Sequence, residues 1–541
     1  MHTPLWRAFV RALTAARRAN YAVAGRSVPR FLPAFDPSRR QLLRATLAGP
    51  AALAATGLSR PVAAQHAQSR GSQPRIAIVG GGLAGLTAAY HLQQAGLSAN
   101  LYEARARLGG RVRTLRAGVA PGLAVEFGGE FINSDHDDML ALAAELGLTL
   151  FDRAADAARF PLPATSYLFD GRSIPEAEMA EALRPLARQI ADDAALLDED
   201  YERYAPAFDR TSVARYLDQH AGLIAQPFVR ALIERSIRTE LGVEADETSA
   251  LHLIFLLPTV DGAAVEVLGN SDEQFTVEGG SSRIVEGLVA RLKGSVHLRH
   301  VLTAVAQRGA GYRLAFANGT SVDAEYVILA MPFAVLRRVT LDLRLPGRLR
   351  RMIAELDSGR NEKLLAGFRR RAWRQDAGFS SEAWSDIGFA AAWDATQREV
   401  DREAGALTFF LGGEEAAALD GRNTRQLGQQ FVDALGAALP GLREAATGTF
   451  ARSRWGADRF SNGSYVTFRP GQYTRFSDFL YIEADEPMEY QEVRVGNLAF
   501  AGEHLSDAYY GYMNGAAQTG RLAAASIAAL VADARGLRAT S

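Results

Sequence analysis

The sequence RIAIVGGGLAGLTAAYHLQQAGLSANLYEARARLGGR, residues 75–111, decides the fold of this chain of 541 residues. Residues 75–79 form a short apolar run with branched side chains, which is typical of a buried parallel strand. Residues 83–95 place apolar side chains on one helical face, and residues 99–102 form a second short run of strand composition. The stretch therefore predicts a strand, a tight turn, a helix and a second strand in that order.

Three glycines in the turn have the G-x-G-x-x-G spacing. Gly80 lets the chain turn tightly out of the first strand, and Gly82 leaves room for a pyrophosphate to approach the backbone. Gly85 lets the helix pack closely on the strand, and the helix start offers free N–H groups to phosphates. Glu103, after the second strand, can accept hydrogen bonds from ribose hydroxyls. This order of parts predicts a dinucleotide-binding site rather than a structural glycine turn.

The segments that follow resemble those of the flavin amine oxidase family, which includes monoamine, polyamine and L-amino acid oxidases. The run EARARLGGR, residues 103–111, adds a second glycine pair and arginines beside the expected phosphates. Residues 125–131 (VEFGGEF) and 500–504 (FAGEH) resemble segments that contact the flavin in that family. The resemblance implies that the cofactor is FAD rather than a nicotinamide dinucleotide. The residues expected to bind it are Gly80, Gly82, Gly85, Glu103, Arg105, Gly109, Gly110, Arg111, Gly128, Gly129, Glu130, Val301, Trp455, Gly502, Glu503, Tyr512 and Met513.

Lys363 is the sharpest candidate for chemistry. It stands in NEKLLAGFRRRAW, ten residues before Trp373, and the resembling family has a lysine at this spacing from an aromatic residue. There the lysine holds a water against the flavin N5, where a positive charge also favours reaction with dioxygen. Without the resemblance, a solvated lysine in a basic stretch is the simpler interpretation.

Two tyrosines match the aromatic pair that encloses the amine in front of the flavin in this family. Tyr465 ends the run SNGSY, residues 461–465, and Tyr512 lies in GYMNGA, residues 511–516. Ser464 stands where monoamine oxidases carry the cysteine that bonds FAD, so the resemblance implies non-covalent FAD. Lys363, Tyr465 and Tyr512 are thus the expected catalytic residues, whereas core packing is the simpler interpretation of either tyrosine alone.

These assignments predict an α/β fold, a two-lobed flavoprotein with a Rossmann-type FAD-binding domain of three separated segments and an α+β substrate domain. The FAD-binding segments are placed at 73–134, 270–341 and 454–535. The substrate domain is placed at 135–269, where helical patterns such as 177–197 and 212–223 dominate, and at 342–453. Residues 296–305 are expected to form one strand, and residues 536–541 a tail.

Composition restricts the partners. The chain contains no cysteine, which excludes disulfides, thiol catalysis, cysteine-ligated metals and a cysteinyl flavin, and no metal site is expected. Residues 1–72 carry 11 Arg, no Lys and one Asp, so the remaining chain holds an excess of acidic residues. An acidic folded part argues against nucleic acid as a partner. A homodimer is possible, but the sequence does not determine the oligomeric state.

Residues 1–72 resemble an export address and linker. Ser38-Arg39-Arg40-Gln41-Leu42-Leu43-Arg44 resembles the twin-arginine signal, and a modest apolar run, 45–58, leads to a small-residue site near 62–64. The apolar run is short for a membrane span. We therefore expect export by the twin-arginine machinery to the periplasm or the medium, with a disordered basic tail as the alternative.

An acidic cluster follows the glycine-pair segment. Ser134 or Asp135 is expected to cap a helix, with Asp137 and Asp138 in its first turn. Recognition of a basic substrate is the alternative role for these acids. L-Amino acid oxidases grip the substrate carboxylate with an arginine shortly after the glycine-pair segment. Here Asp138 falls where that region would supply a base, and other arginines in residues 140–270 could take its place.

The expected reaction is oxidation of a primary amine or an L-amino acid, with hydride transfer to FAD, an imine that hydrolyses, and hydrogen peroxide from dioxygen. No general base is apparent in the sequence. Two other functions stay open: a flavin dehydrogenase or desaturase that passes electrons to a quinone, and an exported flavin-binding protein without turnover.

Overall fold

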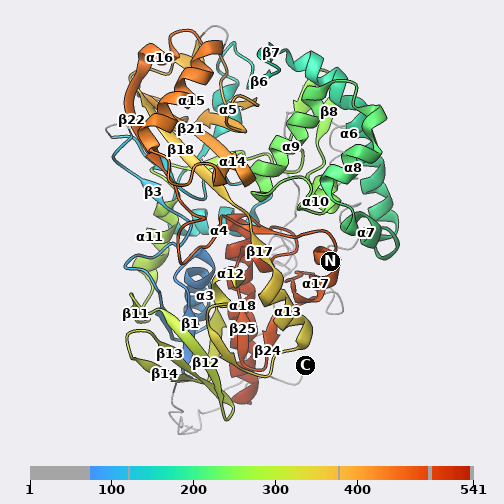
Figure 1. Ribbon diagram of the computed structural model, residues 1–541. Helices are drawn as coiled ribbons and strands as arrows, with labels where there is room; N and C mark the ends of the chain where they lie inside the picture. The colour runs from blue at the N-terminus through green and yellow to red at the C-terminus, as the bar shows by residue number, and fades with distance from the viewer. Residues whose placement is uncertain (1–72, 120–121, 376–377, 485–489, 537–541) are drawn as a thin grey trace, which may run out of the picture.

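The computed structural model describes residues 73–119, 122–375, 378–484 and 490–536 (Figure 1). The twin-arginine motif and the tail from residue 537 lie outside the described residues. Among the described helices, none combines the length and the apolar composition that crossing a bilayer requires.

A six-stranded, mostly parallel sheet carries the dinucleotide fingerprint, and its strand order is β11-β2-β1-β15-β25-β24. Its centre is β1 (Ile76–Val79), which pairs in parallel with β2 (Ala99–Tyr102) and β15 (Tyr326–Leu329). The other strands are β25 (Leu498–Phe500), the short β11 (Val296–His297) and the antiparallel edge strand β24 (Arg494–Val495). The buried faces of β1 and β15 agree with the apolar runs of the sequence.

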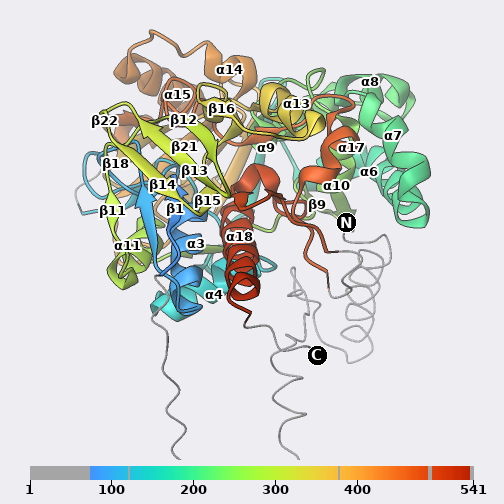
Figure 2. The same cartoon turned by 90° about the horizontal axis from the view of Figure 1, so that it is seen from below.

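Two helices from opposite ends of the chain cover this sheet side by side (Figures 1 and 2). Helix α3 (Leu83–Gln94) follows β1 directly, as predicted, and α18 (Met513–Ala534) follows the C-terminal glycine motif. The two helices approach so closely that a Cβ atom at Gly520 would lie 2.3 Å from the carbonyl oxygen of Ala84. Small residues at this contact therefore hold the first and last segments of the sheet together.

A second, seven-stranded sheet forms the upper half of the view in Figure 1. Its order is β22-β18-β21-β20-β19-β6-β7, and it is contacted by α6 (Glu176–Glu199), α9 (Pro227–Leu241), α14 (Gly413–Ala417) and α15 (Thr424–Ala438). The strands are β22 (Ala446–Arg452), β18 (Asn361–Phe368), β21 (Gly405–Gly412), β20 (Ala391–Asp394), β19 (Glu382–Ser385), β6 (Thr165–Phe169) and β7 (Arg172–Ile174). A group of helices at the upper right of Figure 1 comprises α6, α7 (Tyr201–Arg210), α8 (Val213–Gln219), α9 and α10 (Ala250–Leu256).

Shorter elements accompany the two large sheets. They include α4 (Asp137–Leu146), β10 (Phe275–Val277), α11 (Ser282–Arg291) and the small sheet of β12 (Leu302–Arg308), β13 (Gly311–Phe316), β14 (Ser321–Ala324) and β16 (Thr340–Asp342). A mixed α/β architecture with two separate large sheets is the predicted fold class. The domain boundaries at the individual residues given above stay predictions.

Two local predictions were wrong. The strand expected over 296–305 is broken into β11 and β12, because Arg299 adopts a left-handed conformation, φ 59°, that no continuous strand contains. Helix α4 has His136 at its N-cap, and no side chain caps the helix. Ser134, an expected cap, instead donates from its backbone N–H to the Asp272 carboxylate at 3.0 Å. The competing long-range contact was invisible in the local pattern, whereas Asp137 and Asp138 do occupy the first turn.

Candidate active site

A cavity of about 1810 Å³ runs from the carboxyl edge of the six-stranded sheet to the underside of the seven-stranded sheet. Pockets for drug-sized ligands usually measure about 300–1000 Å³, so this one has room for a large cofactor and a substrate together. All of the expected site residues line it except Gly85, which packs beneath the turn. It therefore combines the fingerprint, the lysine and the two tyrosines in one continuous space.

The glycines of the fingerprint differ in what surrounds them. A Cβ at Gly80, whose φ is 112°, would lie 2.1 Å from the Ala330 oxygen, and one at Gly85 would lie 1.9 Å from the Gly80 oxygen. At Gly82 the nearest protein atom would be 4.0 Å away, at the Cα of Gly110. Gly80 and Gly85 are thus required by packing, and Gly82 keeps free the space in front of the α3 N-terminus, where a pyrophosphate belongs.

Glu103 closes the carboxyl end of β2 beside this turn. Its two carboxylate oxygens accept hydrogen bonds from the backbone N–H groups of Gly81 and Arg105, each at 2.7 Å. Because each oxygen retains a further lone pair, the orientation suits ribose hydroxyls. Val301 lines the same end of the cavity. Arg105 also lines it, but its guanidinium is held by Asp458 and, at 2.9 Å, by Ser461.

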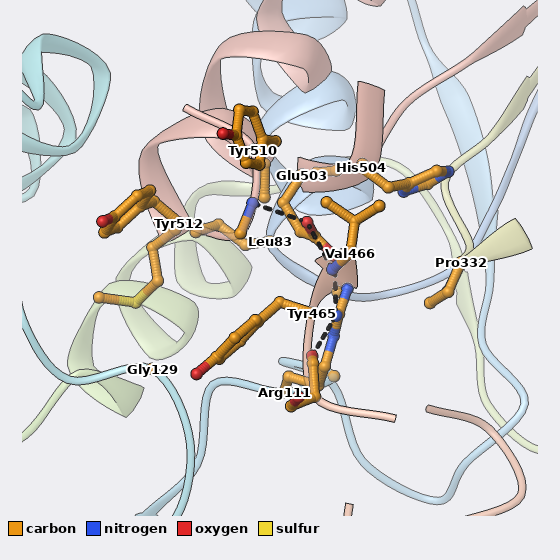
Figure 3. Close-up of a pocket in the computed structure, with 18 of the residues that line it drawn as sticks. Leu83, Arg111, Gly129, Pro332, Tyr465, Val466, Glu503, His504, Tyr510 and Tyr512 are labelled. Carbon is orange, nitrogen blue, oxygen red and sulfur yellow. Dashed lines mark hydrogen bonds and ion pairs between the residues drawn. The ribbon is translucent and has the colours of Figure 1, made fainter. Parts of the chain in front are cut away.

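The middle of the cavity is built around Glu503, as Figure 3 shows. This carboxylate accepts from Arg111 at 2.9 Å and from the Gly511 N–H at 2.9 Å, which ties the second glycine pair to the start of α18. Arg111 also donates to the Ser464 carbonyl. The ion pair holds Arg111 and Glu503 together in the cavity wall, and the contact of each with the cofactor stays a prediction.

The other expected cofactor residues pack as close neighbours along this stretch. A Cβ at Gly128 would overlap the Arg111 oxygen at 1.7 Å, and one at Gly129 would lie 2.7 Å from the Met513 sulfur. Trp455 donates from its indole N–H to the Phe127 oxygen at 2.7 Å. Gly109 and Gly110 have φ values of 95° and 55°, and Gly502 one of 148°. These positions form a smooth wall that admits a flat ring system.

Lys363 lies on β18 with its ammonium group in the cavity wall. The Nζ atom donates to Glu130 at 2.6 Å and to the Gly128 oxygen at 2.9 Å, and the side chains of Lys363 and Glu130 are 8% and 3% exposed. The aromatic neighbour is Trp393, whose ring centroid lies 5.2 Å from Nζ and whose indole N–H donates to Glu130 at 3.2 Å.

Trp373, ten residues after Lys363 in the sequence, is not this neighbour. Trp373 is fully buried in a separate core cluster of the second sheet. It follows the end of β18, and strand geometry carries it away from Lys363, whereas Trp393 approaches from β20 across β21. Glu130, an expected cofactor residue, accepts a hydrogen bond from the lysine, and its contact with the cofactor stays a prediction. Sequence spacing along one strand carries no signal for a partner that arrives from another.

Tyr465 and Tyr512 both line the cavity, and the rings come from separate segments, before β23 (Val466–Thr467) and at the N-cap of α18 (Figure 3). The Tyr465 hydroxyl donates to the Thr239 carbonyl, and the Tyr512 hydroxyl donates to the Glu240 carboxylate at 2.9 Å. Burial raises the pKa of both phenols well above the usual range, so both donate as neutral hydroxyls.

Carboxylates dominate the part of the cavity beyond the tyrosines. Glu240, Glu273 and Glu382 line it from α9, from the loop before β10 and from β19. Burial first, and then the charge of Glu382, raises the pKa of Glu240 to about 7, against the hydrogen bond from Tyr512. Burial likewise raises the pKa of Glu273 well above normal, against the charge of Arg153. None of these three residues was identified from the sequence, because each lies outside the motifs.

Arg521 in the cavity wall is already engaged by carboxylates. Arg521 donates to both oxygens of Asp138, at 2.6 and 3.0 Å, and to Glu483 at 2.7 Å. Asp138 therefore lies in the first turn of α4 and forms an ion pair with Arg521. These two contacts account for its position without recognition of a basic substrate. The remaining cations that line the cavity are Lys363, bound to Glu130, and Arg105, Arg111, Arg338 and Arg459 around the motifs of the cofactor end.

The described residues fit an FAD. They provide an open glycine cradle at a helix N-terminus, a carboxylate at the end of β2 and a smooth glycine wall leading to Lys363 and the two tyrosines. Within the described ranges no group of three or more histidine, aspartate or glutamate side chains is arranged to hold a metal ion.

Comparison with known proteins agrees with this geometry. L-Tryptophan oxidase RebO of Lentzea aerocolonigenes is 27% identical over 484 residues, with 81% of this chain and 94% of RebO covered. Amine oxidase B of the dog is 25% identical, with 84% and 85% covered. A putrescine oxidase structure with bound putrescine superimposes with a TM-score of 0.69 at 24% identity, covering 85% of this chain and 99% of that chain.

The flavin containing amine oxidoreductase family matches residues 83–528, which include the cavity-lining segments from the start of α3 into α18. With this match, the cofactor is FAD and the protein is an enzyme of amine oxidation. The chain belongs to the flavin containing amine oxidoreductase family.

Proposed function

We propose that this enzyme oxidises amines that carry no carboxylate next to the amine, and that it is not an L-amino acid oxidase. The observation that carries this proposal is the set of acidic side chains beyond Tyr465 and Tyr512, where Glu240, Glu273 and Glu382 line the substrate space. A substrate carboxylate would meet carboxyl groups there, with repulsion from those that are ionised, and among the described residues it would meet no uncommitted arginine beyond the tyrosines. An amine that enters as a cation is attracted by the same groups.

Bound FAD would accept a hydride from the carbon next to the amine nitrogen. Dioxygen would then reoxidise the reduced FAD and be converted to hydrogen peroxide. The chain orients the substrate and shields it from water. The tyrosine rings present flat faces to the amine, and their hydroxyls are held by Thr239 and Glu240. Lys363 keeps a fixed positive charge at the cavity wall through Glu130 and Gly128. The released imine hydrolyses to an aldehyde or ketone and ammonia.

Pairs of substrates that differ only in the carboxylate test this proposal. Tryptamine with L-tryptophan, pentylamine with L-norleucine and cadaverine with L-lysine are compared by peroxide release and by anaerobic bleaching of FAD. We expect each amine to exceed its amino acid at least tenfold in kcat/KM. The reverse order would show that the protein is an amino acid oxidase. Bleaching of FAD without peroxide release in air would show a dehydrogenase. If no compound bleached the FAD, the protein would not catalyse this reaction.

We further propose that FAD is bound without a covalent link. Ser464 occupies the position of the flavin-linked cysteine in the resemblance, and the chain has no cysteine. The Ser464 hydroxyl donates to the side-chain oxygen of Asn361 at 2.6 Å. Acid precipitation of the same preparation should therefore release the yellow colour into the supernatant, whereas colour retained in the pellet would indicate a bond through another residue.

For localisation we propose export by the twin-arginine route, on the motif at Arg39 and Arg40. Replacing both arginines by lysine preserves the charge but removes the signal. We expect the wild-type enzyme to appear outside the cytoplasm and the variant to accumulate inside it with FAD bound. Equal export of both proteins would show that this motif is not the address.

A further inference from the structure

The C-terminal end of helix α9 contacts both tyrosines of the active site. Thr239 and Glu240 are consecutive residues, and each accepts the hydroxyl of one tyrosine, Tyr465 and Tyr512 respectively. The side-chain amide of Asn361 donates to the Thr239 oxygen at 3.0 Å. The helix end is thus fixed against the cage formed by the two rings.

This helix end is electronegative. The last carbonyl groups of a helix carry partial negative charge, and α9 ends at Leu241 before Gly242, whose φ is 65°. Glu240 adds a carboxylate at the cavity surface, and no ion pair involves it among the described residues. The nearby Arg238 is turned away to Glu244, at 2.6 Å, and to Glu415, at 3.2 Å. An alkylammonium group that enters the cage therefore meets a carboxylate free of any cation.

Amine oxidation needs a proton acceptor at this place. Alkylamines have a pKa of about 10.4 and arrive as ammonium ions near neutral pH. The carbon–hydrogen bond can be broken as hydride only after the nitrogen lone pair is free, so one N–H proton must leave first. The phenols cannot accept it because they are neutral, and Glu130 is bound to Lys363. Glu382 already accepts from the Trp384 indole at 3.0 Å, and Glu273 faces Arg153.

We propose that Glu240 is a catalytic residue that accepts the proton of the substrate ammonium ion. In this step an N–H bond of the ammonium breaks and an O–H bond forms on the Glu240 carboxylate, without change of oxidation state. The carboxylate oxygen held by Tyr512 fixes the orientation of the group. The proton returns to solvent after the imine has left. The assignment rests on the proposed amine substrate and names the group that prepares it for oxidation.

The environment of Glu240 sets the pH dependence. The titratable groups that face it are Tyr512 and Tyr465 from the cage, Glu382 from β19 and Glu273 from the loop before β10. Its pKa of about 7 arises from burial and is raised further by Glu382. A base must be ionised to act, so the rate should rise with pH through about 7 and level off above it.

Anaerobic stopped-flow reduction of bound FAD by pentylamine from pH 6 to 10 tests the proposal with the full FAD-loaded enzyme. In Glu240→Gln we expect the rise near neutral pH to disappear and the rate at pH 7.5 to fall at least tenfold. The rate should then approach that of the wild type towards pH 10, where neutral amine is abundant. Glu240→Asp should restore part of the neutral-pH rate.

Glu382→Gln is the matched control, because it removes a neighbouring carboxylate of the same cavity. Here the rise should persist and move to lower pH, since Glu382 raises the pKa of Glu240. Unchanged circular dichroism and FAD absorbance would confirm intact folding of each variant. A Glu240→Gln profile equal to that of the wild type, or one lowered by the same factor at every pH, would overturn the assignment. Failure of every amine to reduce wild-type FAD would instead overturn the proposed function.

Discussion

Replacing Lys363 by methionine is expected to lower the free energy of unfolding by about 3–5 kcal/mol, the usual cost of leaving a buried charge unpaired. Glu130 is 3% exposed and would keep only the Trp393 indole as donor. The same change should slow peroxide release roughly 10²–10³-fold, because it removes a fixed positive charge where negative charge develops. Urea unfolding and oxygen-dependent reoxidation of reduced enzyme measure the two effects separately.

The double variant Lys363→Met with Glu130→Gln separates stability from catalysis. It removes the unpaired charge as well as the lysine, so most of the lost stability should return, while peroxide release stays slow. Glu130→Gln alone should keep Lys363 in place through the Gly128 carbonyl. A Lys363→Met protein as stable as the wild type would show that the carboxylate finds another partner or a proton, and fast reoxidation would exclude the lysine from catalysis.

Gly82→Asn is expected to abolish FAD binding while the protein still folds. Asparagine is a good helix N-cap, which is the place of Gly82 in α3, and a Cβ there would have no protein atom closer than 4.0 Å. Its side chain would occupy the space that the pyrophosphate needs. We expect affinity for FAD to fall at least roughly 100-fold, or about 2.8 kcal/mol. Titration of the apoprotein with FAD, followed by fluorescence, gives this value.

Gly85→Ala is the contrasting variant of the same turn. Its Cβ would lie 1.9 Å from the Gly80 oxygen, so helix and strand must separate. We expect a loss of about 3 kcal/mol or more in stability of the apoprotein, measured by thermal unfolding without FAD. The Gly82→Asn apoprotein should unfold at the same temperature as the wild-type apoprotein. If Gly82→Asn also unfolded early, or bound FAD normally, the separation between a packing glycine and a binding glycine would be wrong.

The features that the sequence predicted well are local. The strand, turn and helix of residues 75–95 depend on apolar periodicity and glycine spacing over a few residues, so β1, α3 and β2 agree with the prediction to within one residue at most ends. The motifs at Lys363, Tyr465 and Tyr512 identified residues that do line one cavity. Even the first turn of α4 was predictable from Asp137 and Asp138, although its cap was not.

By itself the sequence therefore determined that the chain has a dinucleotide fold, an FAD site and three candidate catalytic residues. Only the tertiary structure decided which partners surround them. Glu130 reaches Lys363 across 233 positions of the chain, and Glu240 reaches Tyr512 across 272. Such contacts depend on the packing of strands and helices from distant segments, and the polar side chains involved follow no local period. The charge of the substrate space is consequently a property of the assembled fold.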